Sequence, residues 1–221
     1  MDFWEWEPYY EQILSDFGFE RLKDEKAARL LSRLLSRKRT KLSDLRGFLV
    51  GQVVTVLGNG PRLADELHLV EGVVIAADEA ATVAQSKGIA PEIIVTDLDG
   101  GPEDLLAAND RGSIVIVHAH GDNMEALGRW AGRLSSRSLG TTQSSPLAQI
   151  YNFGGFTDGD RAVFLADHFG ARVIRLLGFD FERPNPKDQS PEVKQRKLIW
   201  AKKLIRLLQK RSVILFPASS S

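Results

Sequence analysis

Short apolar runs alternate with helical patterns along most of the chain. The apolar runs are rich in β-branched residues, and we expect them to be strands at Val53–Leu57, Val73–Ala76, Ile93–Val95, Ile114–Val117, Gln149–Phe153, Val173–Leu177 and Val213–Phe216. Apolar positions at helical spacing fall between most of these runs. They predict helices at Arg62–Leu69, Glu79–Gln85, Pro102–Asn109, Asn123–Leu134, Asp158–His168 and Pro191–Gln209. The alternation predicts an α/β fold with a mostly parallel, doubly wound, Rossmann-like sheet.

Two amphipathic helices are expected before the first strand, near Phe3–Phe17 and Asp24–Lys38. We therefore expect residues 1–46 to form an N-terminal helical extension and residues 47–221 to form the α/β domain that carries the chemistry. The Ser/Thr/Gly-rich segment Ser135–Ser145 is expected to be a loop.

Composition excludes several classes of protein. The 221 residues include no cysteine, which excludes disulfides and cysteine nucleophiles. The apolar runs are far shorter than the roughly 20 residues of a membrane span. The first residues, Met1 to Glu5, have no basic region followed by an apolar one, so they do not resemble a signal peptide. These features predict a cytoplasmic protein.

The net charge of zero hides an uneven distribution of charge. Residues 21–46 carry ten Lys and Arg against three Asp and Glu, and residues 183–211 carry ten against two. Residues 47–182 carry nine against eighteen. An acidic centre between basic flanks suggests a cation site beside surfaces that accept anions, although solvated helix faces would also explain most of the basic residues.

Ligands of open parallel sheets bind beyond the carboxyl ends of the strands, so the residues that follow each run matter most. Asp97 and Asp99 follow a run and lie one residue apart. In an extended backbone both carboxylates would face the same side. They could then hold one hard cation such as Mg²⁺. A helix cap with a solvent-facing acid is the alternative.

The turn after the first strand, Gly58-Asn59-Gly60-Pro61, would let a phosphate approach the backbone and the start of a helix. Asp78 ends the second strand, where a dinucleotide-binding fold would hold ribose. Leu63 occupies the place of the third glycine of that motif, so a plain tight turn stays open as an alternative.

His118 and His120 precede Asp122 and Asn123 at the end of another strand. We expect these side chains to form hydrogen bonds to a ligand or a loop. A transition-metal site and a purely structural role are the alternatives.

The segment from Gly154 to Ala162 combines a Gly-Gly turn with the start of a helix. Thr157 or Asp158 could cap that helix. Capping explains one acid but does not explain Asp158, Asp160 and Arg161 together. With the acids at other strand ends and nearby basic groups, this segment is suited to phosphoryl or diphosphoryl transfer.

Taken in order, these motifs resemble the archaeal-type 6-hydroxymethyl-7,8-dihydropterin diphosphokinases. The resemblance is carried by Gly58-Asn59-Gly60-Pro61, Val95-Thr96-Asp97-Leu98-Asp99-Gly100, His118-Ala119-His120-Gly121-Asp122-Asn123, Thr141-Thr142-Gln143, Asn152–Ala162 and Gly178-Phe179-Asp180-Phe181. The family is similar to the catalytic domain of thiamin diphosphokinases. Arg161 stands where those enzymes favour Lys, and the chain lacks room for their extra β-sandwich domain.

The resemblance implies an Mg²⁺-dependent kinase that moves diphosphate from ATP to a pterin hydroxymethyl group and releases AMP, in folate or methanopterin biosynthesis. It implies catalytic roles for Asp97, Asp99, Asp158 and Arg161, and metal binding by Asp97, Asp99, Asp158 and Asp160. The implied substrate-binding residues are Gly58, Asn59, Gly60, Asp78, His118, His120, Asp122, Asn123, Thr142, Gln143, Asn152, Gly155, Thr157 and Asp180. The implied partners are ATP and a pterin, without nucleic acid or membrane, and a homo-oligomer is compatible with the sequence.

Three other functions remain as alternatives. A metal-dependent glycosyltransferase could use the same acidic pair to hold a nucleotide diphosphate, and a thiamin diphosphokinase would differ in its acceptor. A nucleic-acid-binding protein could use the basic flanks, but it would have no use for acids at the strand ends.

Overall fold

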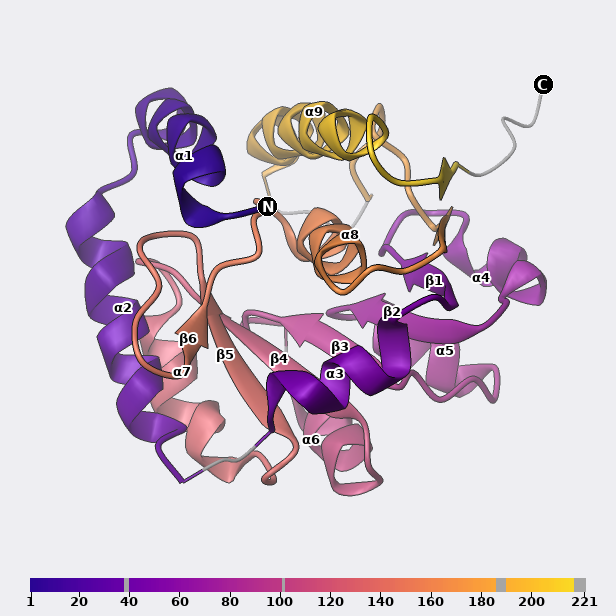
Figure 1. Cartoon of the computed structure of the whole chain (residues 1–221), viewed down its shortest axis with the longest axis horizontal. Helices are drawn as coiled ribbons and strands as arrows, with labels where there is room; N and C mark the ends of the chain where they lie inside the picture. The colour runs from indigo at the N-terminus through magenta and orange to yellow at the C-terminus, as the bar shows by residue number, and fades with distance from the viewer. Residues whose placement is uncertain (38–39, 101, 186–189, 217–221) are drawn as a thin grey trace. The chain divides into compact units, whose positions relative to one another are not determined.

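Eight strands form one sheet in the part of the chain that the structure covers. The computed structural model describes residues 1–37, 40–100, 102–185 and 190–216 (Figure 1). The strands are β1 (Val53–Leu57), β2 (Val73–Ala77), β3 (Ile93–Thr96), β4 (Ile114–Ala119), β5 (Ser138–Thr142), β6 (Ile150–Tyr151), β7 (Val173–Leu177) and β8 (Ile214–Leu215). Their order is β6-β5-β4-β3-β2-β1-β7-β8. The pairs β1–β2, β1–β7, β4–β5, β5–β6 and β7–β8 are parallel, which confirms the predicted α/β fold.

Helices occupy most of the connections between the strands. The α-helices are α1 (Phe3–Phe17), α2 (Arg21–Leu34), α3 (Leu42–Leu49), α4 (Leu63–Glu66), α5 (Ala80–Ser86), α6 (Glu103–Asp110), α7 (Met124–Trp130), α8 (Asp158–His168) and α9 (Pro191–Leu208). Short 3₁₀ turns at Leu67–Leu69 and Ala131–Arg133 follow α4 and α7. Within the ranges described, no helix combines the length and the apolar character needed to cross a membrane.

The chain divides into two compact units. One contains Met1–Lys41 and Val95–Gly154, and the other contains Leu42–Ile94 and Gly155–Ser221. The expected boundary between residues 46 and 47 falls within α3, a helix that the sequence pattern did not predict. The division into a helical extension and an α/β catalytic domain stays a prediction.

In the first unit, the N-terminal helices α1 and α2 pack against the rest of the unit. Helix α1 begins at a capping box formed by Asp2 and Glu5, and it ends at Gly18, which has a left-handed φ of 69°. Its apolar face buries Trp6 and Tyr10 completely. Helix α2 packs along α7, β4 and β5 (Figure 1), so α2 covers the strands that end near the two histidines.

Strand β5 contradicts the expected loop at Ser135–Ser145. All five of its residues are buried, although the strand contains serine, threonine and glycine. Its hydroxyls find partners within the unit: Thr141 Oγ1 donates to the carbonyl of Val117 at 3.2 Å. A Cβ on Gly140 would lie 2.3 Å from Ile150 Cδ1. Close packing therefore selects glycine at position 140 despite the low strand propensity of glycine.

In the second unit, α8 is the central helix. It packs against β1 and β2, and α9 packs against α8 (Figure 1). Residues Ala162 to Ala166 of α8 are consequently buried without interruption. The last four residues of β1 and of β2 are buried as well, as expected for strands covered on both faces. This packing fixes the start of α8 beside the ends of β1 and β2.

Candidate active site

The glycine-rich turn after β1 packs against the turn after β7. The Gly60 amide donates to the carbonyl of Gly178 at 2.7 Å. A Cβ on Gly60 would lie 2.4 Å from that carbonyl oxygen, and a Cβ on Gly178 would lie 2.2 Å from the carbonyl oxygen of Gly58. Gly178 also has a φ of +68°, which favours glycine. These glycines are needed for backbone packing, and phosphate contact by the turn stays a prediction.

Asn59 lies in the same turn, and Leu63 follows it in the chain. Asn59 Nδ2 donates to Glu79 Oε2 at 2.9 Å, and the carbonyl of Asn59 accepts from Asn185 Nδ2 at 2.9 Å. Leu63 is buried and begins α4. A Cβ on Gly178 would lie 2.8 Å from the Cβ of Leu63. Leu63, at the place of the motif's third glycine, therefore packs against the turn after β7.

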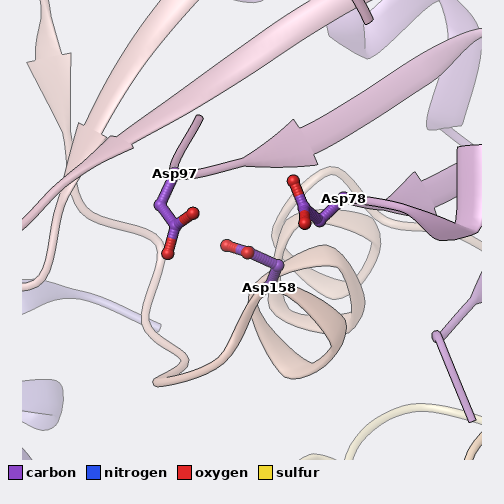
Figure 2. A group of neighbouring side chains, drawn as sticks. All are labelled: Asp78, Asp97 and Asp158. Atoms are coloured by element: carbon purple, nitrogen blue, oxygen red, sulfur yellow. The ribbon is translucent and has the colours of Figure 1, made fainter. Parts of the chain in front are cut away.

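Asp78 and Asp158 bring two carboxylates together within the second unit (Figure 2). Asp78 directly follows β2 and has a φ of +47°, a left-handed conformation in which Asp is enriched. Asp158 is the first residue of α8. A carboxylate oxygen of one lies within 4.8 Å of a carboxylate oxygen of the other. Two negative charges at that separation repel by about 3 kcal/mol at an effective dielectric constant of about 20, which favours a bound cation.

Arg161 lies beside this pair. Its Nη1 donates to Asp158 Oδ1 at 3.0 Å, and the two side chains are 9% and 15% exposed. Gly155 allows the close approach, because a Cβ there would lie 2.7 Å from the backbone N and Cα of Arg161. The first turn of α8 thus presents a guanidinium next to the Asp78–Asp158 pair. A planar guanidinium is suited to binding phosphate oxygens.

Asp160 is completely buried and closes the start of α8. One of its carboxylate oxygens accepts from the Phe156 amide at 2.7 Å, and the other accepts from the Thr157 amide at 2.7 Å and from the Thr157 hydroxyl. Thr157 and Asp160 form a capping box. Burial raises the pKa of Asp160 above its ordinary value, although these hydrogen bonds and Arg161 act in the opposite direction. Both oxygens are therefore already engaged in the helix cap.

In the first unit, Asp97 stands at a turn and not in an extended strand. Strand β3 ends at Thr96, whose hydroxyl accepts from the Leu98 amide at 3.0 Å. Leu98 has a φ of +66° and is buried, an uncommon conformation for a bulky residue. The expectation that an extended backbone aligns Asp97 and Asp99 is therefore wrong. Asp97 is half-buried, whereas Asp99 is exposed and donates its amide to Asp97 Oδ1 at 3.3 Å.

The loop after β4 holds Asp97 from two sides. His120 Nδ1 accepts from the Asp122 amide at 3.4 Å, which leaves the ring proton on Nε2. His120 Nε2 then donates to Asp97 Oδ2 at 3.3 Å. Asn123 Nδ2 donates to the carbonyls of Asp97 and His118, at 2.8 and 2.7 Å. These contacts agree with the expected hydrogen-bonding role of this loop.

His118, Thr142 and Asn152 are held by hydrogen bonds inside the first unit. His118 Nδ1 lies 3.1 Å from the hydroxyl of Thr141, and the His118 ring is buried. Thr142 Oγ1 accepts from the Ser144 amide at 3.3 Å. Asn152 Nδ2 donates to the carbonyls of Gln143 and Ser144, at 3.0 and 2.9 Å. Their predicted contacts with substrate stay predictions.

Asp122 and Asp180 lie in turns. Asp122 is exposed. Asp180 Oδ1 accepts from the amides of Glu182 and Arg183, both at 3.0 Å, and Asp180 Oδ2 accepts from the Arg183 guanidinium at 3.0 Å. Partial burial would raise the pKa of Asp180, but these donors lower it below its ordinary value. Asp180 is therefore engaged with its own turn.

The sequence reasoning missed Asp24. It lies on α2 with an exposure of 3%, and it accepts from Tyr10 Oη at 2.7 Å and from Gln143 Nε2 at 2.8 Å. Trp6 Nε1 donates to the carbonyl of Gln143 at 2.8 Å. Burial, followed by the hydrogen bond to Asp24, raises the pKa of Tyr10 strongly. The sequence contained a signal for this residue, because Asp24 lies at helical spacing on the same face as Ala27, Ala28 and Leu31.

Comparisons with known proteins find a matching family and similar chains. A family described as "6-hydroxymethylpterin diphosphokinase MptE-like" matches residues 28–186. Proteins named 6-hydroxymethyl-7,8-dihydropterin pyrophosphokinase from Pyrococcus furiosus and Methanothermobacter thermautotrophicus are each 41% identical, covering 93% of this chain and 93% and 94% of theirs. A protein of the same name from Methanocaldococcus jannaschii is 37% identical, covering 98% of this chain and 99% of its own.

Proposed function

Because the chain belongs to the 6-hydroxymethylpterin diphosphokinase MptE-like family, we propose that it transfers diphosphate from ATP to the hydroxymethyl group of 6-hydroxymethyl-7,8-dihydropterin. The observation that carries the proposal is the identity of 37 to 41% with three relatives of that name over at least 93% of the chain. The motifs on which the resemblance is based lie within the matched residues 28–186.

The reaction forms one bond and breaks another. The hydroxymethyl oxygen of the pterin attacks the β-phosphorus of ATP, and the bond from that phosphorus to the oxygen bridging the α-phosphate breaks. AMP leaves with the electron pair of that bond, and the hydroxyl proton passes to solvent. The protein needs no covalent intermediate, so its task is to align the two substrates and to stabilise phosphate charge.

We assign Mg²⁺ to Asp78 and Asp158 of the second unit, and we keep Asp97 of the first unit as the metal ligand that the resemblance implies. Carboxylate oxygens are the donors that Mg²⁺ prefers. The repulsion between Asp78 and Asp158 supports a cation there. Strand β3 neighbours β2 in the sheet and leads directly to Asp97, so Asp78 and Asp97 both follow the carboxyl ends of neighbouring strands. When bound, the ion would neutralise charge on the phosphates.

This set differs from the one that the resemblance implied. Asp160 is replaced by Asp78, because the oxygens of Asp160 are engaged in the cap of α8. Asp99 is left out because it is exposed beyond the turn at Leu98. Arg161 is held by Asp158 and would bind an oxygen of the transferred diphosphate.

The test is an assay of AMP release from ATP with Mg²⁺, using 6-hydroxymethyl-7,8-dihydropterin, thiamin and a no-acceptor control. We expect AMP and the pterin diphosphate in equal amounts in the first reaction alone. Transfer to thiamin in preference to the pterin would contradict the proposed acceptor. Release of a nucleoside diphosphate from a nucleotide sugar, without any AMP from ATP, would favour a glycosyltransferase instead.

A further inference from the structure

Asp24 is a buried carboxylate that binds three donors from three different segments. Oδ1 accepts from the Gly121 amide at 2.8 Å, while Oδ2 accepts from Tyr10 and from Gln143. Gly121 lies in the loop after β4, Tyr10 lies on α1, and Gln143 follows β5. One side chain of α2 therefore ties a neighbouring helix to two loops at the carboxyl ends of strands.

These contacts require a carboxylate. An Asn at this position would offer one acceptor oxygen, and its NH₂ group would face a donor. If the Asn oxygen served Tyr10 and Gln143, the NH₂ group would point at the Gly121 amide, and that hydrogen bond would be lost. Leaving a buried donor without a partner is unfavourable, so the loop would move away from α2.

The loop after β4 is also in direct contact with the backbone side of α2. A Cβ on Gly121 would lie 2.6 Å from the Cβ of Lys23 and 3.5 Å from Asp24 Oδ1. The nearest atom is therefore the Cβ of Lys23, which is fixed by the backbone of α2, and not the flexible end of a side chain. Both the hydrogen bond and this close approach set where Gly121 lies relative to α2.

Gly121 directly follows His120 in the chain. His120 Nε2 donates to the carboxylate of Asp97, and Asn123, two residues beyond Gly121, donates to the carbonyl of Asp97. A shift of Gly121 would therefore move both groups that orient Asp97. Asp24 is therefore linked to Asp97 by its hydrogen bond to Gly121, by the peptide bond from Gly121 to His120, and by the contact of the His120 ring with Asp97.

We propose that Asp24 is a positioning residue for the diphosphate-transfer site, which it serves by fixing the loop that orients the Asp97 carboxylate. The inference rests on the proposed function, because Asp97 is assigned there to the metal. It gives the N-terminal helices a role in the chemistry in addition to their packing. Groups that orient a metal ligand typically change metal affinity or activity by about 10- to 100-fold when they are altered.

The test compares Asp24→Asn with Tyr10→Phe. Each variant removes a hydrogen bond of the same buried carboxylate, but only the first disturbs the contact with Gly121. Mn²⁺ binding is measured by electron paramagnetic resonance in the absence of nucleotide and pterin. We expect Asp24→Asn to weaken Mn²⁺ binding about 10- to 100-fold and Tyr10→Phe to change it less than about twofold. Equal Mn²⁺ affinity in the unchanged chain and in Asp24→Asn would overturn the proposal, as would equal losses in both variants.

A second measurement does not depend on metal. The chain has four histidines, so the imidazole signals of His120 can be assigned in ¹H–¹⁵N spectra of the metal-free protein. We expect the Nε2-protonated form in the unchanged chain, altered His120 signals in Asp24→Asn and unaltered ones in Tyr10→Phe. If Asp24→Asn does not fold, Gly121→Ala takes its place in both measurements, because it displaces the same loop. Unaltered His120 signals in the folded variant would overturn the inference.

The two proposals fail in different ways. If the unchanged chain binds no Mn²⁺, the metal assignment of the proposed function is wrong, and the His120 spectra still decide whether Asp24 orients the loop. If the unchanged chain binds Mn²⁺ but transfers no diphosphate to the pterin, the proposed reaction is wrong while the positioning role stands on the difference between the two variants.

Discussion

Replacing Asp158 by Asn separates the two roles that the start of α8 could have. The substitution keeps the shape of the side chain and leaves an oxygen that can accept from Arg161. It removes a repulsion from Asp78 of about 3 kcal/mol and an attraction to Arg161, at 3.0 Å, of about 5.5 kcal/mol, both at an effective dielectric constant of about 20. Because these changes oppose each other, we expect the metal-free free energy of unfolding to fall by only about 2 kcal/mol. The corresponding fall in Tm is about 4–8 °C.

The response of the folded chain to Mg²⁺ is the measurement that separates a metal ligand from a helix-start residue. A ligand present at 100 times its Kd stabilises the folded state by about 2.7 kcal/mol. We expect calorimetry to show this Mg²⁺-dependent rise in Tm for the unchanged chain and to show most of it lost in Asp158→Asn. In the AMP-release assay, turnover should fall by about 100-fold or more, because a metal carboxylate is lost.

The neighbouring acid supplies the control. Asp160→Asn places an NH₂ group against amides that now bind a carboxylate, so we expect about 1–3 kcal/mol of destabilisation together with a retained Mg²⁺-dependent rise in Tm. The reasoning about Asp158 is refuted if Asp158→Asn keeps turnover within about twofold and still gains stability from Mg²⁺. Asp158 would then be a helix-start residue without a metal.

Three further predictions concern other positions. Asp97→Asn should reduce turnover far more than Asp99→Asn in the AMP-release assay, because Asp99 is exposed beyond the turn at Leu98; equal losses would contradict the assignment of the metal to Asp97. Gly178→Ala should lower the free energy of unfolding in urea by at least about 2 kcal/mol more than Gly88→Ala. Both glycines have positive φ, but a Cβ on Gly178 would lie 2.2 Å from the carbonyl oxygen of Gly58, whereas a Cβ on Gly88 would have no atom within 4 Å. Equal losses of free energy of unfolding in the two variants would show that the chain relieves this close contact. The pKa of Asp180 is lowered, so its ionised form stabilises the fold above the unfolded pKa of about 3.9, and this stabilisation is lost as pH falls through the folded pKa. In urea unfolding, the difference in free energy of unfolding between Asp180→Asn and the unchanged chain should therefore be larger at pH 6 than at pH 3. A difference that does not change with pH would contradict the lowered pKa.

Hydrophobic periodicity predicted the fold because strands buried on both faces read as continuous apolar runs. Strand β5 was not predicted, because Gly140 packs closely against α2 and β6 and leaves room only for a small residue, so the strand contains no continuous apolar run. The sequence located the strand ends that carry acids, but it could not predict their local geometry. The left-handed turn at Leu98 separates Asp97 from Asp99, although an extended backbone was the simplest expectation.

Long-range partners were the part that periodicity could not supply. The approach of Asp78 to Asp158 depends on how α8 packs against β2, and nothing in the local sequence states that contact. Likewise, Asp24 meets Gln143 across 119 residues of chain. The acid within the apolar stripe of α2 indicated a buried partner, but it did not indicate which one.

That separation in the chain has a consequence for folding during synthesis. Helices α1 and α2 are synthesised before two of the three donors to Asp24, which are Gly121 and Gln143; the second follows Asp24 by 119 residues. At about 5–20 residues per second, the N-terminal helices wait roughly 6 to 24 seconds for these partners. During that interval, the apolar faces around Trp6 and Leu31 have no strands to cover them. Slower translation before Gln143 would therefore prolong the exposure of these apolar faces.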